Sequence, residues 1–212
     1  MCARMSVKRR IISIINEEFE KQNELEIHFS PKGDWTYHDE FWSSLLTLSS
    51  DKYRENYWLD SSTCFRWYGN MRFVHLDFSL SMNPGSSLAM DREKISIKSF
   101  NEDSSRKLVS TIVKKFIRYS KRNTLPYVKE HYWADHYHAS DTWQNINKAV
   151  LCFLSHEFDE GMAYWNRAKA CYSNESTVDA IAYLEANMIS KERLIQAIKE
   201  ICAYNRKFFQ TE

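Results

Sequence analysis

Hydrophobic positions near the start of the chain recur at the spacing of an α-helix. Ile11, Ile15 and Phe19 fall four residues apart on one face of residues 6–22. Ser6 stands just before them, and its hydroxyl is the kind of group that accepts a backbone hydrogen bond at a helix start. The pattern therefore predicts a helix over 6–22.

The spacing then changes to the two-residue alternation of strands. Leu25, Ile27 and Phe29 alternate with polar residues, which is typical of a short half-buried strand. Residues 30–34 contain one proline and one glycine, so they are predicted to form a turn. A second short alternating run covers residues 94–98 and predicts another strand.

The clearest local signal is a hairpin. A strand over 64–68 runs into Gly69-Asn70, a pair favoured in tight turns, and alternation continues over 71–82. Residues 39–49 stay open, because their aromatic and leucine positions suit a helix while their serines and threonine weaken it. These runs together predict an antiparallel sheet with helices on one face.

After Phe100 the pattern is helical to the end of the chain. An apolar stripe predicts a helix over 104–121, with Asn101 as a cap and Pro126 just beyond its end. No strand is predicted further on. The remaining predicted helices cover 127–137, 142–156, 158–172, 177–188 and 191–209.

The expected fold class is α+β, a small antiparallel sheet with covering helices followed by an all-helical C-terminal half. The division is placed between 1–124 and 125–212, and the helical region is expected to pack on the first as one body. Residues 1–124 hold 20 Lys/Arg and 16 Asp/Glu, whereas residues 125–190 hold 4 and 9. The acidic stretch is either ordinary solvated surface or a docking face for a basic partner.

The cysteine content, the length of apolar runs and the net charge indicate which cellular compartment and which partners to expect. The 5 cysteines are odd in number, widely spaced and without a C-x-x-C pair, which favours a reducing compartment over a disulfide framework. The N-terminus lacks the apolar stretch of a signal peptide, and no window is apolar for long enough to span a membrane. A cytoplasmic protein without a membrane partner is expected. The net charge of +1 makes nucleic acid an unlikely partner.

One cluster has the composition of a metal site. His131, Asp135, His136 and His138 fall close to one face of a helix, where imidazole and carboxylate ligands could converge. The competing interpretation is an aromatic helix that packs on the sheet and carries its histidines at the rim. That structural interpretation is preferred, so neither a metal nor another cofactor is expected.

Two polar groups have the composition of acid–base sites. Glu157, Asp159 and Glu160 are interpreted as charges at a helix start, because adjacent helical residues point apart. His75 and Asp77 share one face of a predicted strand and are interpreted as part of its solvent-exposed face. No catalytic residue is assigned, and the chain is not expected to be an enzyme.

Aromatic and basic residues are interspersed in the predicted 64–82 hairpin, at Phe65, Arg66, Trp67, Tyr68, Arg72 and Phe73. Such rings stack on the bases of single-stranded nucleic acid in some proteins. A cross-strand aromatic cluster explains them equally well.

Residues 142–172 resemble one helical hairpin of the tetratricopeptide type. The resemblance is carried by Gly161 after the turn, an aromatic residue on the next helical turn, and Ala168. These positions allow two helices to approach closely. There is no second copy at the 34-residue period, so a single hairpin of similar packing is expected and not a repeat array.

The whole organisation resembles the small cytosolic immunity proteins that bacteria carry against contact-dependent and other polymorphic toxins. The shared features are a leading helix, the 64–82 hairpin, the 104–121 helix and the break at Leu125-Pro126. The resemblance implies a non-catalytic protein that binds one toxin domain and blocks its active site. The alternatives are a helical scaffold or a metal-dependent enzyme that uses the cluster from His131 to His138. The residues expected to bind the partner are Glu130, Tyr132, Trp133, Asp135, Glu157, Asp159 and Glu160.

Overall fold

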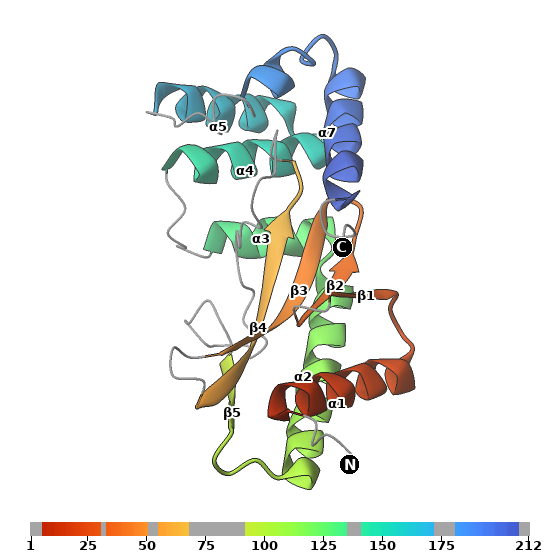
Figure 1. Cartoon of the computed structure of the whole chain (residues 1–212). Helices are drawn as coiled ribbons and strands as arrows, with labels where there is room; N and C mark the ends of the chain where they lie inside the picture. Colours follow the sequence, from red (N-terminus) through yellow and green to blue (C-terminus); the bar gives the residue numbers. More distant parts are fainter. Residues whose placement is uncertain are drawn as a thin grey trace. The chain divides into compact units, whose positions relative to one another are not determined.

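The computed structural model confirms the α+β fold class (Figure 1). It describes residues 6–30, 33–50, 55–67, 92–134, 141–171 and 181–207. The first half contains α1 (Val7–Gln22), β1 (Ile27–Ser30), β2 (Asp34–His38), β3 (Trp42–Ser50), β4 (Asn56–Phe65), β5 (Arg92–Ser96) and α2 (Glu102–Arg122). The second half contains α3 (Leu125–Ala134), α4 (Asp141–Leu154), α5 (Phe158–Ala170) and α7 (Lys191–Arg206).

The five strands form one antiparallel sheet in the order β1-β2-β3-β4-β5. By its contacts the chain divides into two compact units. Unit 1 holds residues 1–37, 44–62 and 79–121. Unit 2 holds residues 38–43, 63–78 and 122–212, so short strand segments belong with the C-terminal helices.

Helix α1 of unit 1 forms as its spacing predicts. Ser6 accepts a hydrogen bond from the backbone NH of Arg9, and Ile11, Ile14 and Ile15 are buried. The ring of Phe19 lies 6.4 Å from that of Trp35 in β2 and 5.9 Å from that of Phe116 in α2. One aromatic side chain thus joins α1 both to the sheet and to α2.

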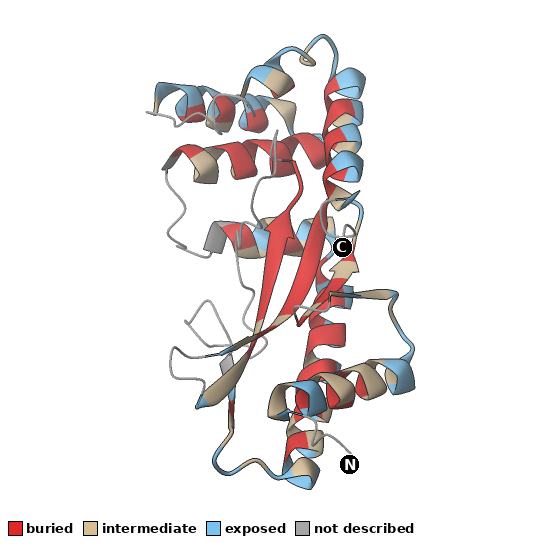
Figure 2. Ribbon diagram, in the orientation of Figure 1, coloured by how far each residue is buried: buried red, intermediate tan, exposed pale blue. Residues whose placement is uncertain are grey.

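Helix α2 also begins where the sequence indicates. The side chain of Asn101 accepts a hydrogen bond from the backbone NH of Ser104, and the apolar stripe is buried. Figure 2 shows the buried face along this helix. The predicted break near Pro126 is confirmed, because α2 ends at Arg122 and α3 begins at Leu125.

The β1–β2 hairpin confirms one predicted turn and corrects one burial prediction. Gly33 adopts a φ of 108°, which a residue with a side chain rarely adopts, and its NH bonds to the carbonyl of Ser30. Phe29 was expected on the buried face, but it is 40% exposed and stacks on Trp35. The edge position of β1 leaves this ring open to solvent on one side.

Strands β3 and β4 were not predicted from the sequence. Residues 39–49 were left between helix and strand, and they contain most of β3. Nearly every residue of β3 from Trp42 to Leu48 is buried, including Ser43 and Ser44, so no polar face marks the alternation. Of the predicted 64–82 hairpin, Cys64 and Phe65 end β4, while the turn and the strand over 71–82 lie outside the described residues.

Helices α3, α4, α5 and α7 of unit 2 fall close to predicted ranges, whereas the first residues of the helix predicted over 177–188 lie outside the described part of the chain. Ser190 caps α7 through a hydrogen bond from the NH of Arg193, and α4 packs extensively on α5. Gly161, Trp165 and Ala168 form the buried face of α5, as the close-packed hairpin prediction requires. Among the residues that the structure describes, no helix combines the length with the apolar run needed to cross a membrane.

Unit 1 contains a surface ion network centred on Arg106 of α2. Its guanidinium donates to Glu17 Oε2 of α1 at 2.6 Å and to Glu102 Oε1 at 3.1 Å, and Arg10 also pairs with Glu102. These hydrogen bonds lower the pKa of Glu17 and of Glu102 below the ordinary value of 4.5. The lowered pKa means that the carboxylates stabilise the fold above pH 4.5, and that this stabilisation is lost as the pH falls through the folded-state value.

We therefore expect that replacing Arg106 with methionine makes the free energy of unfolding depend less on pH in the acidic range. Above pH 4.5 the variant should be less stable than the wild type, and the difference should shrink as the pH falls through the lowered pKa values of Glu17 and Glu102. Urea unfolding followed by circular dichroism at several pH values measures this difference. Arg118→Met, at an exposed position of the same helix, is the matched control and should show no such pH dependence. If the stability of Arg106→Met and of Arg118→Met depended on pH in the same way, the ion network would have no stabilising role.

Candidate functional site

An open groove lies in unit 2 between the first turns of α3 and the turn that joins α4 to α5. Its volume is about 620 Å³. Two apolar residues at the start of α3 line one side, and three carboxylates and one ammonium group lie around them. The lining residues are Leu125, Pro126, Lys129, Glu130, Ser155, Glu157 and Glu160.

The turn between α4 and α5 is a Schellman motif. The NH of Glu157 bonds to the carbonyl of Cys152 at 2.9 Å, and the NH of His156 bonds to that of Phe153 at 3.0 Å. His156 takes the left-handed position with a φ of 62°, where glycine is usual. This tight reversal brings the first turn of α5 alongside the last turn of α4.

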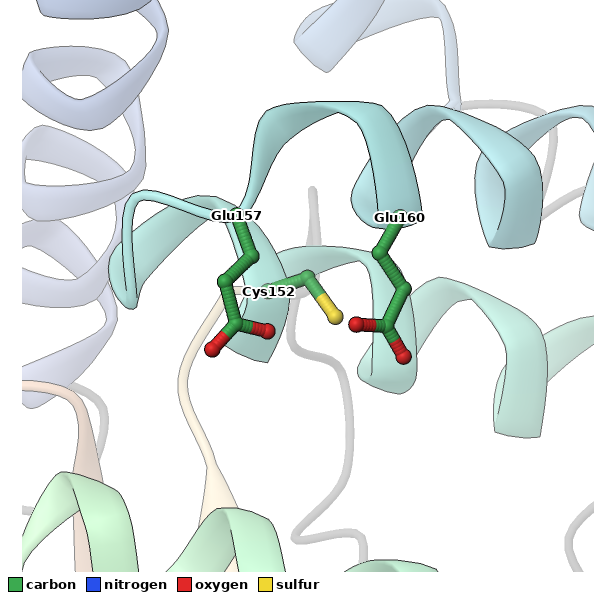
Figure 3. Close-up of side chains that lie close together, drawn as sticks. All are labelled: Cys152, Glu157 and Glu160. Carbon is green, nitrogen blue, oxygen red and sulfur yellow. The ribbon is translucent and has the colours of Figure 1, made fainter.

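Three potential metal ligands meet at this reversal (Figure 3). The sulfur of Cys152 and one carboxylate oxygen from each of Glu157 and Glu160 all lie within 4.8 Å of one another. Cys152 is fully buried, at 0% exposure, whereas both glutamates are exposed. The ammonium group of Lys129 in α3 pairs with the carboxylate of Glu157.

The electrostatics of this cluster keep the thiol protonated. Burial and the nearby Glu160 carboxylate raise the pKa of Cys152 to about 11. Burial by itself lowers the pKa of Lys129, but its hydrogen bond to Glu157 and the surrounding negative groups outweigh burial and raise it. A protonated thiol is a poor nucleophile, so the cluster does not have the properties of a cysteine active site.

The paired-carboxylate interpretation needs a correction. Glu157 and Glu160 were expected to point apart as helix-start charges, but they are three residues apart and their carboxylates converge. Glu157 occupies the N-cap position of α5 without making a side-chain capping hydrogen bond. Asp159, between them in the sequence, is exposed and does not line the groove.

The residues expected to bind a partner fall into four groups, one of which is Asp159 alone, exposed and outside the groove. Glu130, Glu157 and Glu160 line the groove. Tyr132 is not a surface anchor, because it is 4% exposed, its hydroxyl accepts a hydrogen bond from Asn147, and its ring meets Phe65 edge-on. The side chains of Trp133 and Asp135 lie outside the part of the chain that the structure describes.

Only one histidine of the predicted metal-like cluster can be placed. The Nδ1 atom of His131 lies 2.8 Å from the backbone oxygen of Tyr127, and its ring stacks on the ring of Tyr127. Asp135, His136 and His138 lie outside the described residues, as do His75 and Asp77.

The aromatic and basic run at the end of β4 is part of the core of unit 2. Phe65, Arg66 and Trp67 are at most 1% exposed, so the hypothesis of stacking on nucleic-acid bases is wrong for these three residues. Tyr68, Arg72 and Phe73 lie outside the described residues. Phe65 and Trp67 stack on each other at 4.2 Å. Arg66 donates to the backbone oxygen of Asp39, and burial lowers its pKa.

Sequence reasoning missed two residues of the site, Cys152 and Lys129. Cys152 entered the sequence analysis only as one of five widely spaced cysteines, and nothing in the spacing relates Lys129 to Glu157, 28 positions away. Comparisons of the chain with protein-family models, with curated proteins and with solved structures found no match. The geometry of the groove is therefore the basis for assigning a function.

Proposed function

We propose that the chain is a non-catalytic protein-binding module whose groove receives a basic side chain of a partner protein. The observation that supports this proposal is the lining of the groove, which combines the carboxylates of three glutamates with two apolar residues, Leu125 and Pro126. A lysine or arginine side chain has the matching structure, an aliphatic stem that packs on apolar surface and a cationic head. One lysine of the chain itself, Lys129, already pairs with Glu157 in this way.

The absence of a catalytic role is part of the proposal. The protonated state of Cys152 does not favour nucleophilic chemistry, since the thiolate is the reactive form. Interfaces gain association rate and specificity from complementary charge, which acts without any reacting group. The free cysteines at 64, 152, 171 and 202 fit a role in the reducing cytoplasm.

The finer proposal is that the module is an immunity protein that neutralises a cognate toxin domain. Toxins that cleave nucleic acid carry basic substrate clefts, and an acidic groove is complementary to such a cleft. Neutralisation then needs only that the groove and its surroundings cover the toxin's active site. This specific role rests on the resemblance of overall organisation and on the charge of the groove.

The test is the affinity of the full chain for the toxin-like product of a neighbouring gene, measured by calorimetry with a chelator present. Glu160→Lys is expected to raise Kd about 10- to 100-fold, because it places a cation where the partner's cation binds. Asp159→Lys is the matched control, with the same charge change on the same helix but outside the groove, and should raise Kd by less than about threefold in physiological salt.

Two results would overturn the proposal. One is no binding between the two proteins, and the other is an equal loss of affinity in both variants. The second candidate function, a helical scaffold, is favoured by the exposure of two large side chains, Tyr204 in the last turn of α7 (64%) and Ile189 just before the N-cap of that helix (84%). A Kd that responds to Tyr204→Ser and not to Glu160→Lys would support the scaffold instead.

A further inference from the structure

We propose that Cys152, Glu157 and Glu160 form a binding site for a thiophilic divalent cation such as Zn²⁺. The proposal does not depend on the proposed function. It starts from the close approach of one sulfur and two carboxylate oxygens, which all lie within 4.8 Å of one another. Tetrahedral zinc with ordinary bond lengths holds sulfur and oxygen ligands about 3.6 Å apart. Since 4.8 Å is the upper limit of the three separations, the exposed glutamate side chains reach that spacing by moving at most about 1 Å.

The second observation is the burial of the Cys152 thiol and its lack of a hydrogen bond to any described residue. Cys152 is 0% exposed, and its thiol has no hydrogen-bond partner among the described residues. In Figure 3 the sulfur lies between the carboxylates of Glu157 and Glu160. A cysteine that served only as a small apolar residue would be expected to face other apolar groups.

The third observation is the charge around the sulfur. Lys129 pairs with Glu157, but the carboxylate of Glu160 has no ion pair or hydrogen bond within the described part of the chain. Two carboxylates and one ammonium group leave one negative charge, and a thiolate adds a second. A divalent cation neutralises this sum, and the proton that it displaces from the thiol passes to solvent.

The ligand set selects the type of metal. Calcium and magnesium bind oxygen ligands almost exclusively, whereas a thiolate favours zinc and related borderline ions. Three protein ligands leave one tetrahedral position open, and the groove gives water or a partner group access to it. The ammonium group of Lys129 pairs with Glu157 Oε2 and repels a cation bound beside it, so the lysine competes with the metal.

The experiment is a titration of the full reduced chain with Co²⁺ as a spectroscopic substitute for Zn²⁺. We expect a thiolate-to-cobalt charge-transfer band in the near ultraviolet that saturates at one ion per chain and is removed by Zn²⁺. Cys152→Ser should abolish this band, and Cys171→Ser, which removes a partly exposed cysteine at the end of α5, should leave it unchanged. Glu160→Gln should weaken Co²⁺ binding at least 10-fold.

Lys129→Met is expected to change the Co²⁺ affinity in the opposite direction to the ligand substitutions. Removal of the competing ammonium should tighten Co²⁺ binding several-fold. Circular dichroism verifies that each variant is folded. Glu160 is exposed, so its variant remains informative if Cys152→Ser fails to fold. No band in the wild type, a band that survives in Cys152→Ser, or unchanged binding in Glu160→Gln would overturn the proposal.

Discussion

Replacing Asn147 with leucine is expected to lower the free energy of unfolding of unit 2 by about 3 kcal/mol. The Oδ1 atom of Asn147 accepts a hydrogen bond from Trp67 Nε1 at 2.8 Å, and its Nδ2 atom donates to Tyr132 Oη at 3.0 Å. All three side chains are at most 4% exposed. Leucine would leave a buried indole NH and a buried hydroxyl without these bonds, and each such loss costs on the order of 1–3 kcal/mol.

Urea unfolding followed by tryptophan fluorescence measures the loss. Asn166→Leu, the same substitution at an exposed position of α5, is the control and should change the free energy by less than about 0.5 kcal/mol. In a Trp67→Phe background the indole donor is absent, so Asn147→Leu should cost clearly less than in the wild type. An equal cost in both backgrounds would show that the Trp67 hydrogen bond contributes nothing.

The second large effect is expected for Gly161→Ala in α5. A Cβ atom at this position would lie 2.5 Å from Phe153 Cε1 and 3.2 Å from the backbone oxygen of Ala149, both in α4. Phe153 is fully buried, so its ring cannot move away without disturbing the core. Overpacking of this kind costs about 1–3 kcal/mol, and a separation this short places the cost near the upper end, above the ~1 kcal/mol gained in helix propensity.

The net expectation is a loss of about 2 kcal/mol in the free energy of unfolding, measured by urea titration. Ala163→Ser adds one atom at an exposed position of the same helix and should have little effect. Phe153→Leu reduces the facing ring, so Gly161→Ala should be better tolerated in that background. If the loss is the same with and without Phe153→Leu, the contact with the ring is not its cause.

Gly161 also connects packing to the candidate site. It follows Glu160 directly, and its close contact with α4 holds the first turn of α5 near Cys152. Gly161→Ala should therefore weaken Co²⁺ binding as well as stability. Ala163→Ser again supplies the comparison.

Much of the helical structure could be predicted, because helix spacing and caps are local properties of the chain. Ser6 and Asn101 were identified as possible caps, and the structure shows each accepting the expected backbone hydrogen bond. The close packing of α4 on α5 was also predictable, since a glycine inside an otherwise regular helical pattern usually has a packing reason.

The central strands could not be predicted in the same way. Strand β3 is buried along most of its length, and Ser43 and Ser44 are as inaccessible as its leucines. Its sequence consequently lacks the polar alternation that revealed β5, a strand at the sheet edge. Its pairing partners β2 and β4 supply the hydrogen bonds that make it a strand, and those contacts are tertiary.

For the candidate site, too, the sequence indicated some features and tertiary contacts decided the others. The acidity of the stretch after Pro126 is a property of the sequence, and it led to Glu130, Glu157 and Glu160. The convergence of two of these carboxylates on a thiol depends on the tight α4–α5 turn with His156 in the left-handed position. The pairing of Glu157 with Lys129 depends on α3 lying beside that turn.

The sequence alone thus determined the α+β class, the change to an all-helical second half and the acidic surface, because these follow from periodicity, caps and composition. The tertiary structure alone decided that Tyr132 and Arg66 are core residues and that Cys152 meets Glu157 and Glu160. Burial and side-chain convergence depend on which distant segments pack together, and no local pattern in the chain encodes that choice.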